Sequence, residues 1–146
     1  MRAAMSEAKL REDVKKAFKG TGAHLSWIES HATAAGFPDL ELCHEGISQQ
    51  IELKFADATG KVKIRQTQYQ WFRHRTKAMG VPLLWVMHGG FHYLLPGSAV
   101  NKPSPLKTMA DVRSRPHIQF DCPFKLARVI LTHNRQSTLT QTEFIK

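Results

Sequence analysis

Three charged side chains have a spacing that could support chemistry: Asp39 and, after twelve intervening residues, Glu52, which is followed two positions later by Lys54. The apolar runs 40–43 and 47–55 predict two antiparallel strands joined by a two-residue turn. In the register that such a turn imposes, Asp39 lies opposite Glu52, with β-carbons roughly 4.5 to 5.5 Å apart. Lys54 projects to the same side as Glu52, because strand side chains alternate with a period of two.

The same register accounts for the apolar residues of the two strands. With Glu45-Gly46 as the turn, the face opposite to the charged residues carries only aliphatic side chains: Leu40, Leu42, Ile51 and Leu53. A single pairing therefore predicts both a buried stripe and a polar cluster.

Two carboxylates held side by side repel one another, and a cation that neutralises them removes this cost. Hard oxygen ligands favour Mg²⁺, with Mn²⁺ as a substitute, and Mg²⁺ usually takes one or two protein carboxylates and leaves its other positions to water and substrate phosphates. Such a metal lowers the pKa of a bound water and offsets charge in a phosphorane-like transition state. With Lys54 beside the scissile phosphate, Asp39 and Glu52 are suited to phosphodiester hydrolysis.

The flanking segments predict the elements that must position these residues. Apolar residues at helical spacing predict one helix over 6–19, with Ser6 as its N-cap and Gly20 as its stop, and a second over 65–79, with Gly80 as its C-cap. Shorter apolar runs predict further strands at 24–29, 81–87 and 91–95.

The order of these elements predicts an α/β (α+β) fold with helices packed against a central sheet. A chain of 146 residues has the size of one domain, so we predict a single domain over 1–146. Its core is expected over about 6–97, and a basic C-terminal extension over about 101–146, after the break at Lys102-Pro103-Ser104-Pro105. In that extension, the residues from 106 onwards are expected to form one or two short helices.

The composition restricts the function. Lys and Arg number 21 against 12 Asp and Glu, a net charge of +9 that favours a polyanionic partner such as nucleic acid. Cys43 and Cys122 belong to no paired motif, which gives no support for a zinc site or a disulfide scaffold. The sequence has no secretory signal pattern and no apolar run long enough to cross a membrane, so a cytoplasmic location is expected.

At Pro38-Asp39 and Glu52-Leu53-Lys54 the sequence resembles the PD-(D/E)XK nuclease superfamily. Three features look like its VRR-NUC and Holliday-junction-resolvase-like branch, which is often found in phages: Gly36-Phe37-Pro38-Asp39, the Ile-Glu-Leu-Lys strand and the helix with Arg65-x-x-Gln68-x-x-Trp71. The resemblance covers roughly residues 27–87 and implies a restriction-endonuclease-like core, with a central mixed sheet flanked by helices.

The resemblance also implies residue roles. Asp39, Glu52 and the backbone carbonyl of Leu53 would bind the metal. Lys54 would be catalytic, and Gln68 would support the site. The superfamily also tends to place a glutamate on its first helix, for which Glu12 is the candidate here, with Glu7 and Glu29 as competitors.

Several of these residues have a structural alternative. Gln68 would equally suit a solvent-facing position between Gln66 and Gln70, and Trp71 and Phe72 fit a helical core stripe better than a base-stacking platform. Four basic residues could line a phosphate-binding face or simply cover a solvated helix surface: Arg65, Arg73, Arg75 and Lys77. The Gly89-Gly90 pair between His88 and His92 disfavours a helical metal site there.

These observations predict a small Mg²⁺-dependent DNA endonuclease. No reader motif for base sequence is present, so cleavage is expected to be structure-selective, on branched or junction DNA, or nonspecific. One site cuts one strand, so cutting both strands calls for a homodimer. The alternative is a non-catalytic nucleic-acid-binding module whose acidic pair is vestigial, and an enzyme with a non-nucleic substrate is a third option.

Overall fold

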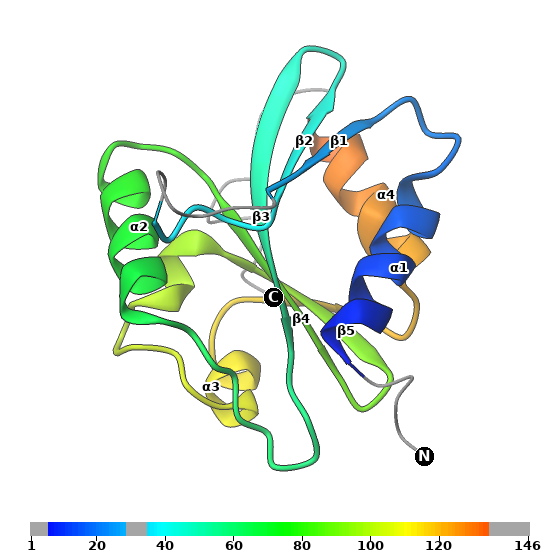
Figure 1. The fold of residues 1–146 in the computed structure, drawn as a ribbon. Helices are drawn as coiled ribbons and strands as arrows, with labels where there is room; N and C mark the ends of the chain where they lie inside the picture. The colour runs from blue at the N-terminus through cyan, green and yellow to red at the C-terminus, as the bar shows by residue number, and fades with distance from the viewer. Residues whose placement is uncertain (1–5, 29–34, 135–146) are drawn as a thin grey trace.

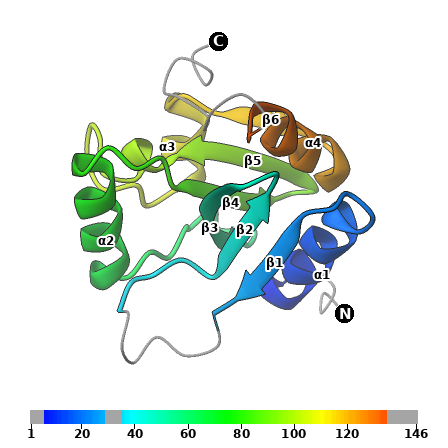
Figure 2. The ribbon, with the colours of Figure 1, turned by 90° about the horizontal axis from the view of Figure 1, so that it is seen from above.

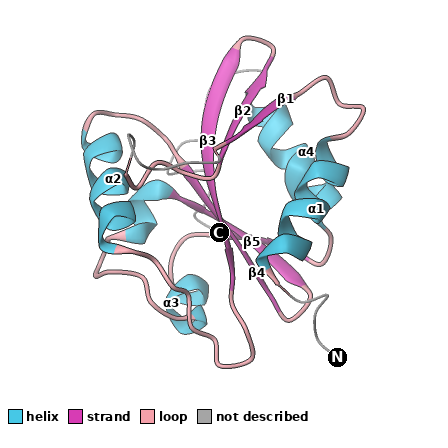
Figure 3. Ribbon diagram, in the orientation of Figure 1, coloured by secondary structure: helices cyan, strands magenta, loops and turns pink. Residues whose placement is uncertain are grey.

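The computed structural model describes residues 6–28 and 35–134 and shows one twisted sheet between two layers of helices (Figure 1, Figure 3). The six strands lie in sequence order, β1 to β6, and within the described residues β3 and β4 form the parallel pair while each other neighbouring pair is antiparallel. The predicted fold class, a central mixed sheet flanked by helices, is confirmed. The elements are α1 (Glu7–Phe18), β1 (His24–Trp27), β2 (Leu40–His44), β3 (Ile47–Phe55), α2 (Gln66–Lys77), β4 (Leu83–His88), β5 (Phe91–Pro96), the 3₁₀ helix η1 (Gly97–Val100), α3 (Met109–Ser114), β6 (Ile118–Phe120) and α4 (Pro123–Asn134).

Each face of the sheet is covered by its own helices: α1 and α4 pack on one face, and α2, η1 and α3 on the other (Figure 1, Figure 2). Strand β4 shows why both faces need a cover. Leu83 and Trp85 point into the cluster under α1 and α4, whereas Leu84 and Val86 point into the cluster under α2. Because its side chains are buried on both faces, this strand needs apolar residues at every position, which explains the continuous apolar run at 81–87.

The first helix agrees with its prediction. Ser6 Oγ accepts a hydrogen bond from the Lys9 amide at 3.3 Å, which satisfies one of the free N–H groups of the first turn. Leu10, Val14 and Phe18 are buried, and Gly20 takes a left-handed conformation with φ 77° after the helix ends.

The hairpin also has the predicted register. Leu40 pairs with Ile51 and Glu41 with Gln50, and the turn residues Glu45 and Gly46 both have positive φ, 52° and 83°. Positive φ at both central residues is the geometry of the two-residue turn that matches strand twist. The predicted buried stripe, which comprises Leu40, Leu42, Ile51 and Leu53, lies in the core under α1 and α4.

The end of α2 differs from the prediction. The left-handed residue after the helix is Met79, with φ 72°, and not Gly80. Gly80 has another role, because a β-carbon there would lie 2.6 Å from Cδ of Arg75. A larger residue at position 80 would displace the Arg75 side chain, so the glycine accommodates this close approach and not a left-handed backbone.

The C-terminal part of the chain is more than an extension. Of the one or two short helices predicted there, two are present, α3 and α4, but β6 was not predicted, because three residues are too few to show a strand period. β6 pairs with β5, and buried side chains from this part complete both clusters, including Leu106, Val112, Leu126 and Ile130. The core therefore extends well past residue 97.

Other features agree with the sequence. His88 and His92 lie on β4 and β5, and Nδ1 of the buried His92 accepts a hydrogen bond from Trp85 Nε1 at 3.0 Å. Cys43 and Cys122 are free thiols. No described helix is long and apolar enough to cross a membrane.

Candidate active site

Asp39 and Glu52 hold each other in place at the start of the β2–β3 pair. The backbone N–H of Asp39 donates to Oε1 of Glu52 at 3.2 Å, and the backbone N–H of Leu53 donates to Oδ2 of Asp39 at 3.2 Å. Each carboxylate is thus bound by the neighbouring strand. The predicted opposition of the two acids is confirmed, and Glu52 faces α2 because its partner on β4 is Leu84, a residue of the α2-side core.

Lys54 joins the two acids from the same face of β3. Its Nζ lies 3.4 Å from Oε2 of Glu52, and the two side chains are 9% and 2% exposed. A buried ammonium beside a buried carboxylate offsets part of the desolvation cost of both groups. The structure therefore brings together the three groups that the spacing predicted.

Gln68 reaches this cluster from the first turn of α2. Its Nε2 donates to Oε2 of Glu52 at 2.8 Å, while its Oε1 accepts from the backbone N–H of Arg65 at 2.9 Å. The side chain is 2% exposed. Of the two interpretations left open by the sequence, the solvent-facing one is wrong.

The electrostatics of Glu52 are unusual. Burial and then the adjacent Asp39 carboxylate raise its pKa to about 8, against a smaller opposing effect of the Lys54 ammonium. A carboxyl group that ionises this late holds a proton at neutral pH unless a cation is added to the site. The local field therefore favours a further positive charge between the two acids.

Arg11 is a site residue that the sequence reasoning missed. It projects from α1, places Nη2 3.5 Å from Oδ1 of Asp39, and lies over the Trp27 ring with Cζ 5.1 Å from the centroid. The resemblance implied an acid on this helix, whereas the sequence signal for Arg11 is a cation one residue after the buried Leu10, on the flank that faces β1.

Of the glutamates expected to complete the site, Glu12 is 59% exposed and pairs with Lys15 at 3.4 Å, so its role in the site stays a prediction. Glu7 is exposed as well, and Glu29 lies outside the described residues.

The motif before Asp39 docks onto α2. Gly36 has φ 82°, and a β-carbon there would clash with the backbone carbonyl of Thr67. Phe37 packs edge-on against Trp71, with ring centroids 5.3 Å apart. The Gly-Phe-Pro-Asp segment therefore packs directly against the helix that carries Gln68 and Trp71. This packing fixes the position of Asp39 just before β2.

The basic residues of α2 occupy different sides of the helix. Arg75 stacks on the ring of Trp71 at 4.6 Å and donates to Gln50 Oε1 at 3.3 Å. Arg73 donates to Asn101 Oδ1 at 3.2 Å on the η1 side. Arg65 and Lys77 are exposed at the two ends of the helix. Of the four cations predicted to bind nucleic acid, Arg75 thus faces β3, Arg73 faces η1, and the other two stay at the ends of the helix.

The donor set fits a hard cation such as Mg²⁺ or Mn²⁺ better than a metal that prefers nitrogen or sulfur ligands. Asp39 and Glu52 offer hard carboxylate oxygens, and the described residues contain no group of three His, Cys, Asp or Glu that could hold a metal on their own. Mg²⁺ commonly binds through one or two carboxylates and completes its shell with water and substrate phosphate. A late-ionising Glu52 beside Asp39 is the arrangement that such an ion would stabilise.

Comparison with known proteins adds evidence on the fold. No protein-family model matches the sequence, and no curated protein matches it. Among solved structures, Hjc, a Holliday junction resolvase from the archaeal hyperthermophile Archaeoglobus fulgidus, matches 83% of this chain and 96% of its own length, with a TM-score of 0.52 and 9% sequence identity. At this identity the likeness concerns the fold: the mixed six-stranded sheet with its flanking helices is that of the Hjc resolvase.

Proposed function

We propose that this protein is a Mg²⁺-dependent endonuclease that hydrolyses phosphodiester bonds of branched DNA. The observation that carries the proposal is the buried Glu52, whose Oε2 contacts Lys54 and Gln68 and whose Oε1 accepts from the backbone N–H of Asp39. Its likeness in fold to a Holliday junction resolvase supports the choice of a DNA junction as substrate. The Gly36-Phe37-Pro38-Asp39 segment and its docking helix support placement in the VRR-NUC branch, the kind common in phages.

Each residue has a separable task in this proposal. Asp39 and Glu52 would hold Mg²⁺ (or Mn²⁺), with the Leu53 carbonyl as a further ligand, and the bound ion would supply an activated water and charge neutralisation at the phosphate. Gln68 fixes Oε2 of Glu52 so that the carboxylate keeps its direction. Lys54 Nζ is within reach of the same site, where it donates hydrogen bonds to the phosphate or orients the nucleophile.

The substrate is delivered by charge. A net charge of +9 attracts DNA without reading its sequence. Arg65, Arg73, Arg75 and Lys77 are the proposed phosphate contacts beside the site. A homodimer would present two sites, as cutting both strands of a junction requires.

The test is cleavage of a four-way junction, single-stranded DNA and duplex DNA in Mg²⁺, Mn²⁺ or EDTA. We expect cutting with either metal, none in EDTA, and a loss of at least 100-fold in Lys54→Ala. The matched control is Lys125→Ala, which removes a lysine that pairs with Asp121 at 3.6 Å and is 61% exposed.

Two outcomes would contradict the proposal. If folded wild-type protein binds all three DNAs and cuts none, the chain is a binding module with a vestigial acidic pair. Cleavage that persists unchanged in Lys54→Ala would remove Lys54 from the mechanism.

A further inference from the structure

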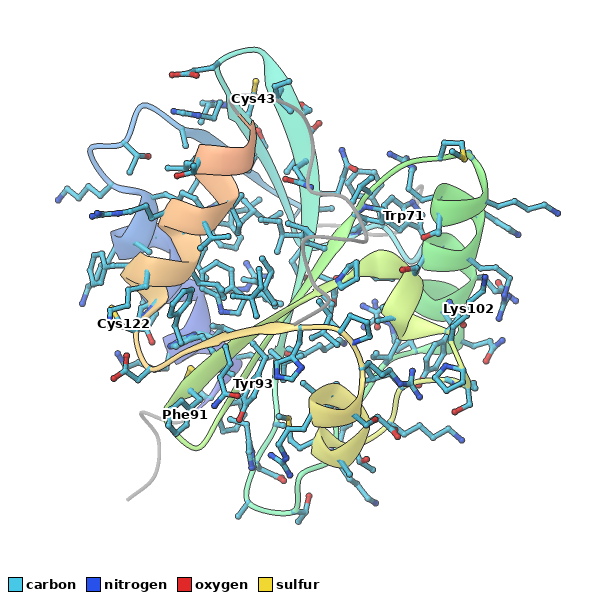
Figure 4. The ribbon with its side chains drawn as sticks, turned by 180° about the vertical axis from the view of Figure 1, so that it is seen from behind. Cys43, Trp71, Phe91, Tyr93, Lys102 and Cys122 are labelled. Carbon is cyan, nitrogen blue, oxygen red and sulfur yellow. The ribbon has the colours of Figure 1, made fainter. Side chains whose placement is uncertain are left out.

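A groove lies between α2 and η1, on the face of the sheet that also carries Glu52. We name it the α2–η1 groove. Its volume is about 400 Å³. Its walls come from both elements and the turns that follow them: Phe72, Arg73, Thr76, Lys77 and Met79 on one side, and Gly97, Ser98, Asn101 and Lys102 on the other. Figure 4 shows Lys102 beside α2.

The cations of this groove lack acidic partners. Its lining contains no Asp or Glu, and Lys77 and Lys102, both exposed, form no ion pair within the described residues. The side-chain partner of Arg73 is the neutral Asn101. By contrast, three lysines on the α1 and α4 side have an acidic partner: Lys9 pairs with Asp13 at 2.7 Å, Lys15 with Glu12 at 3.4 Å and Lys125 with Asp121 at 3.6 Å. Like charges gathered around one hollow favour an anionic ligand.

The charged residues in the stretch of sequence that forms the groove are all basic. Between Asp57 and Asp111 there is no acidic residue, whereas eight Lys or Arg are present. They are Lys61, Lys63, Arg65, Arg73, Arg75, Lys77, Lys102 and Lys107. Three of these eight cations line the groove itself: Arg73, Lys77 and Lys102.

The groove also has an apolar part. Met79 is 86% exposed although it is a large apolar residue, and its φ of 72° is held by a hydrogen bond from its N–H to the Thr76 carbonyl at 3.0 Å. Gly97 lets the chain pass close to Phe72, since a β-carbon there would lie 2.9 Å from Cδ1 of that ring. A flexible methionine at the rim is suited to contact a flat apolar ligand.

One polar atom of the lining is unused. Oγ1 of Thr76 is buried and has no hydrogen-bond partner in the part of the chain that the structure describes. A buried hydroxyl without a partner carries a free-energy cost that a ligand could remove.

We propose that the α2–η1 groove binds one unpaired nucleotide of a DNA strand, with its phosphate on Lys77, Lys102 and Arg73 and its base against Met79. The choice of DNA rests on the proposed function. Thr76 lies eight residues beyond Gln68, about 12 Å along α2, which a DNA strand spans in a few nucleotides. The groove thereby favours DNA that has an unpaired nucleotide near the cut, and the shape of the substrate, not its base sequence, is selected.

The test measures binding in EDTA by the full chain, so it does not depend on cleavage. The probes are a fluorescent duplex and the same duplex with a single-nucleotide bulge. Two variants address the groove: Lys77→Ala/Lys102→Ala, and Met79→Gly, which removes the side chain at a φ that glycine adopts without strain. Lys15→Ala/Lys125→Ala is the control, because it removes the same charge from exposed ion pairs.

We expect wild-type protein to prefer the bulged probe. The double lysine variant should weaken bulge binding at least tenfold and more than duplex binding, and Met79→Gly should weaken bulge binding at least threefold while duplex binding stays unchanged. The inference is overturned if wild-type protein does not discriminate between the probes or if the groove variants match the control. The inference is also overturned if the double lysine variant loses the same affinity for both probes and Met79→Gly changes neither affinity. The groove would then bind backbone phosphate alone. Failure of the proposed function would instead appear as absent cleavage in Mg²⁺ with this binding pattern intact.

Discussion

Nε2 of Gln68 lies 2.8 Å from Oε2 of Glu52 and so ties the first turn of α2 to the middle of β3. The same oxygen is 3.4 Å from Nζ of Lys54, while Oε1 accepts from the backbone of Asp39. The carboxylate is therefore held at both oxygens before any substrate or ion arrives. Its orientation therefore depends on Lys54 of the same strand, on α2 and on the residue that precedes β2.

Replacement of Gln68 by alanine should lower both stability and activity. The change removes a donor to a buried carboxylate and the acceptor of the Arg65 N–H, a loss of about 1 to 3 kcal/mol in the free energy of unfolding. Urea unfolding measures it, and Gln70→Ala, an exposed position on the same helix, is the control. Equal stability of the two variants would show that the Gln68 contacts contribute nothing.

The stability of the metal-free protein should fall as the pH rises from about 5 to about 8. Glu52 ionises near its ordinary value of 4.5 in the unfolded chain, but its pKa is about 8 in the folded chain. Between these values the folded state binds one more proton, so each step up in pH favours unfolding, by a few kcal/mol in total.

Urea unfolding in EDTA across this pH range measures the Glu52 contribution as the difference between wild type and Glu52→Gln, which mimics the protonated acid. Mg²⁺ at pH 8 should restore wild-type stability and leave the variant unchanged. Parallel pH curves for the two proteins would show that Glu52 has an ordinary pKa.

Arg11→Ala should raise the affinity of the site for Mn²⁺ several-fold. The guanidinium lies 3.5 Å from Oδ1 of Asp39 and competes with a metal for the same negative charge. Titration calorimetry with Mn²⁺ alone measures the effect, and Lys16→Ala, an exposed lysine on the same helix, controls for net charge. Weaker Mn²⁺ binding in Arg11→Ala would mean that Arg11 orients Asp39 instead of competing for it.

Gly36→Ala should be strongly destabilising. A left-handed φ costs a non-glycine residue about 1 to 2 kcal/mol, and the added methyl would also collide with the Thr67 carbonyl. Gly20→Ala is a matched control, because Gly20 has φ 77° and nothing within 4 Å of an added β-carbon. Thermal unfolding compares the two, and a loss no larger than in Gly20→Ala would refute the role of Gly36 in docking the segment onto α2.

The hairpin, its register and the meeting of Asp39, Glu52 and Lys54 could all be predicted from the order of the residues. These are local consequences of a two-residue turn and of side-chain alternation, so two apolar runs and Glu45-Gly46 were sufficient evidence. The helix ends at Ser6 and Gly20 follow from equally local rules of capping.

The contacts that site residues make with other elements could be seen only once the helices and strands were packed together. Arg11 reaches Asp39 because α1 packs beside β1. Glu12, the next residue, projects about 100° further round the helix and is therefore exposed to solvent. Strand β6 exists because β5 offers a free edge, not because three residues have a strand pattern. The raised pKa of Glu52 likewise depends on the elements that exclude water from it. Burial and contact between distant segments are properties of packing, and no short stretch of sequence encodes them.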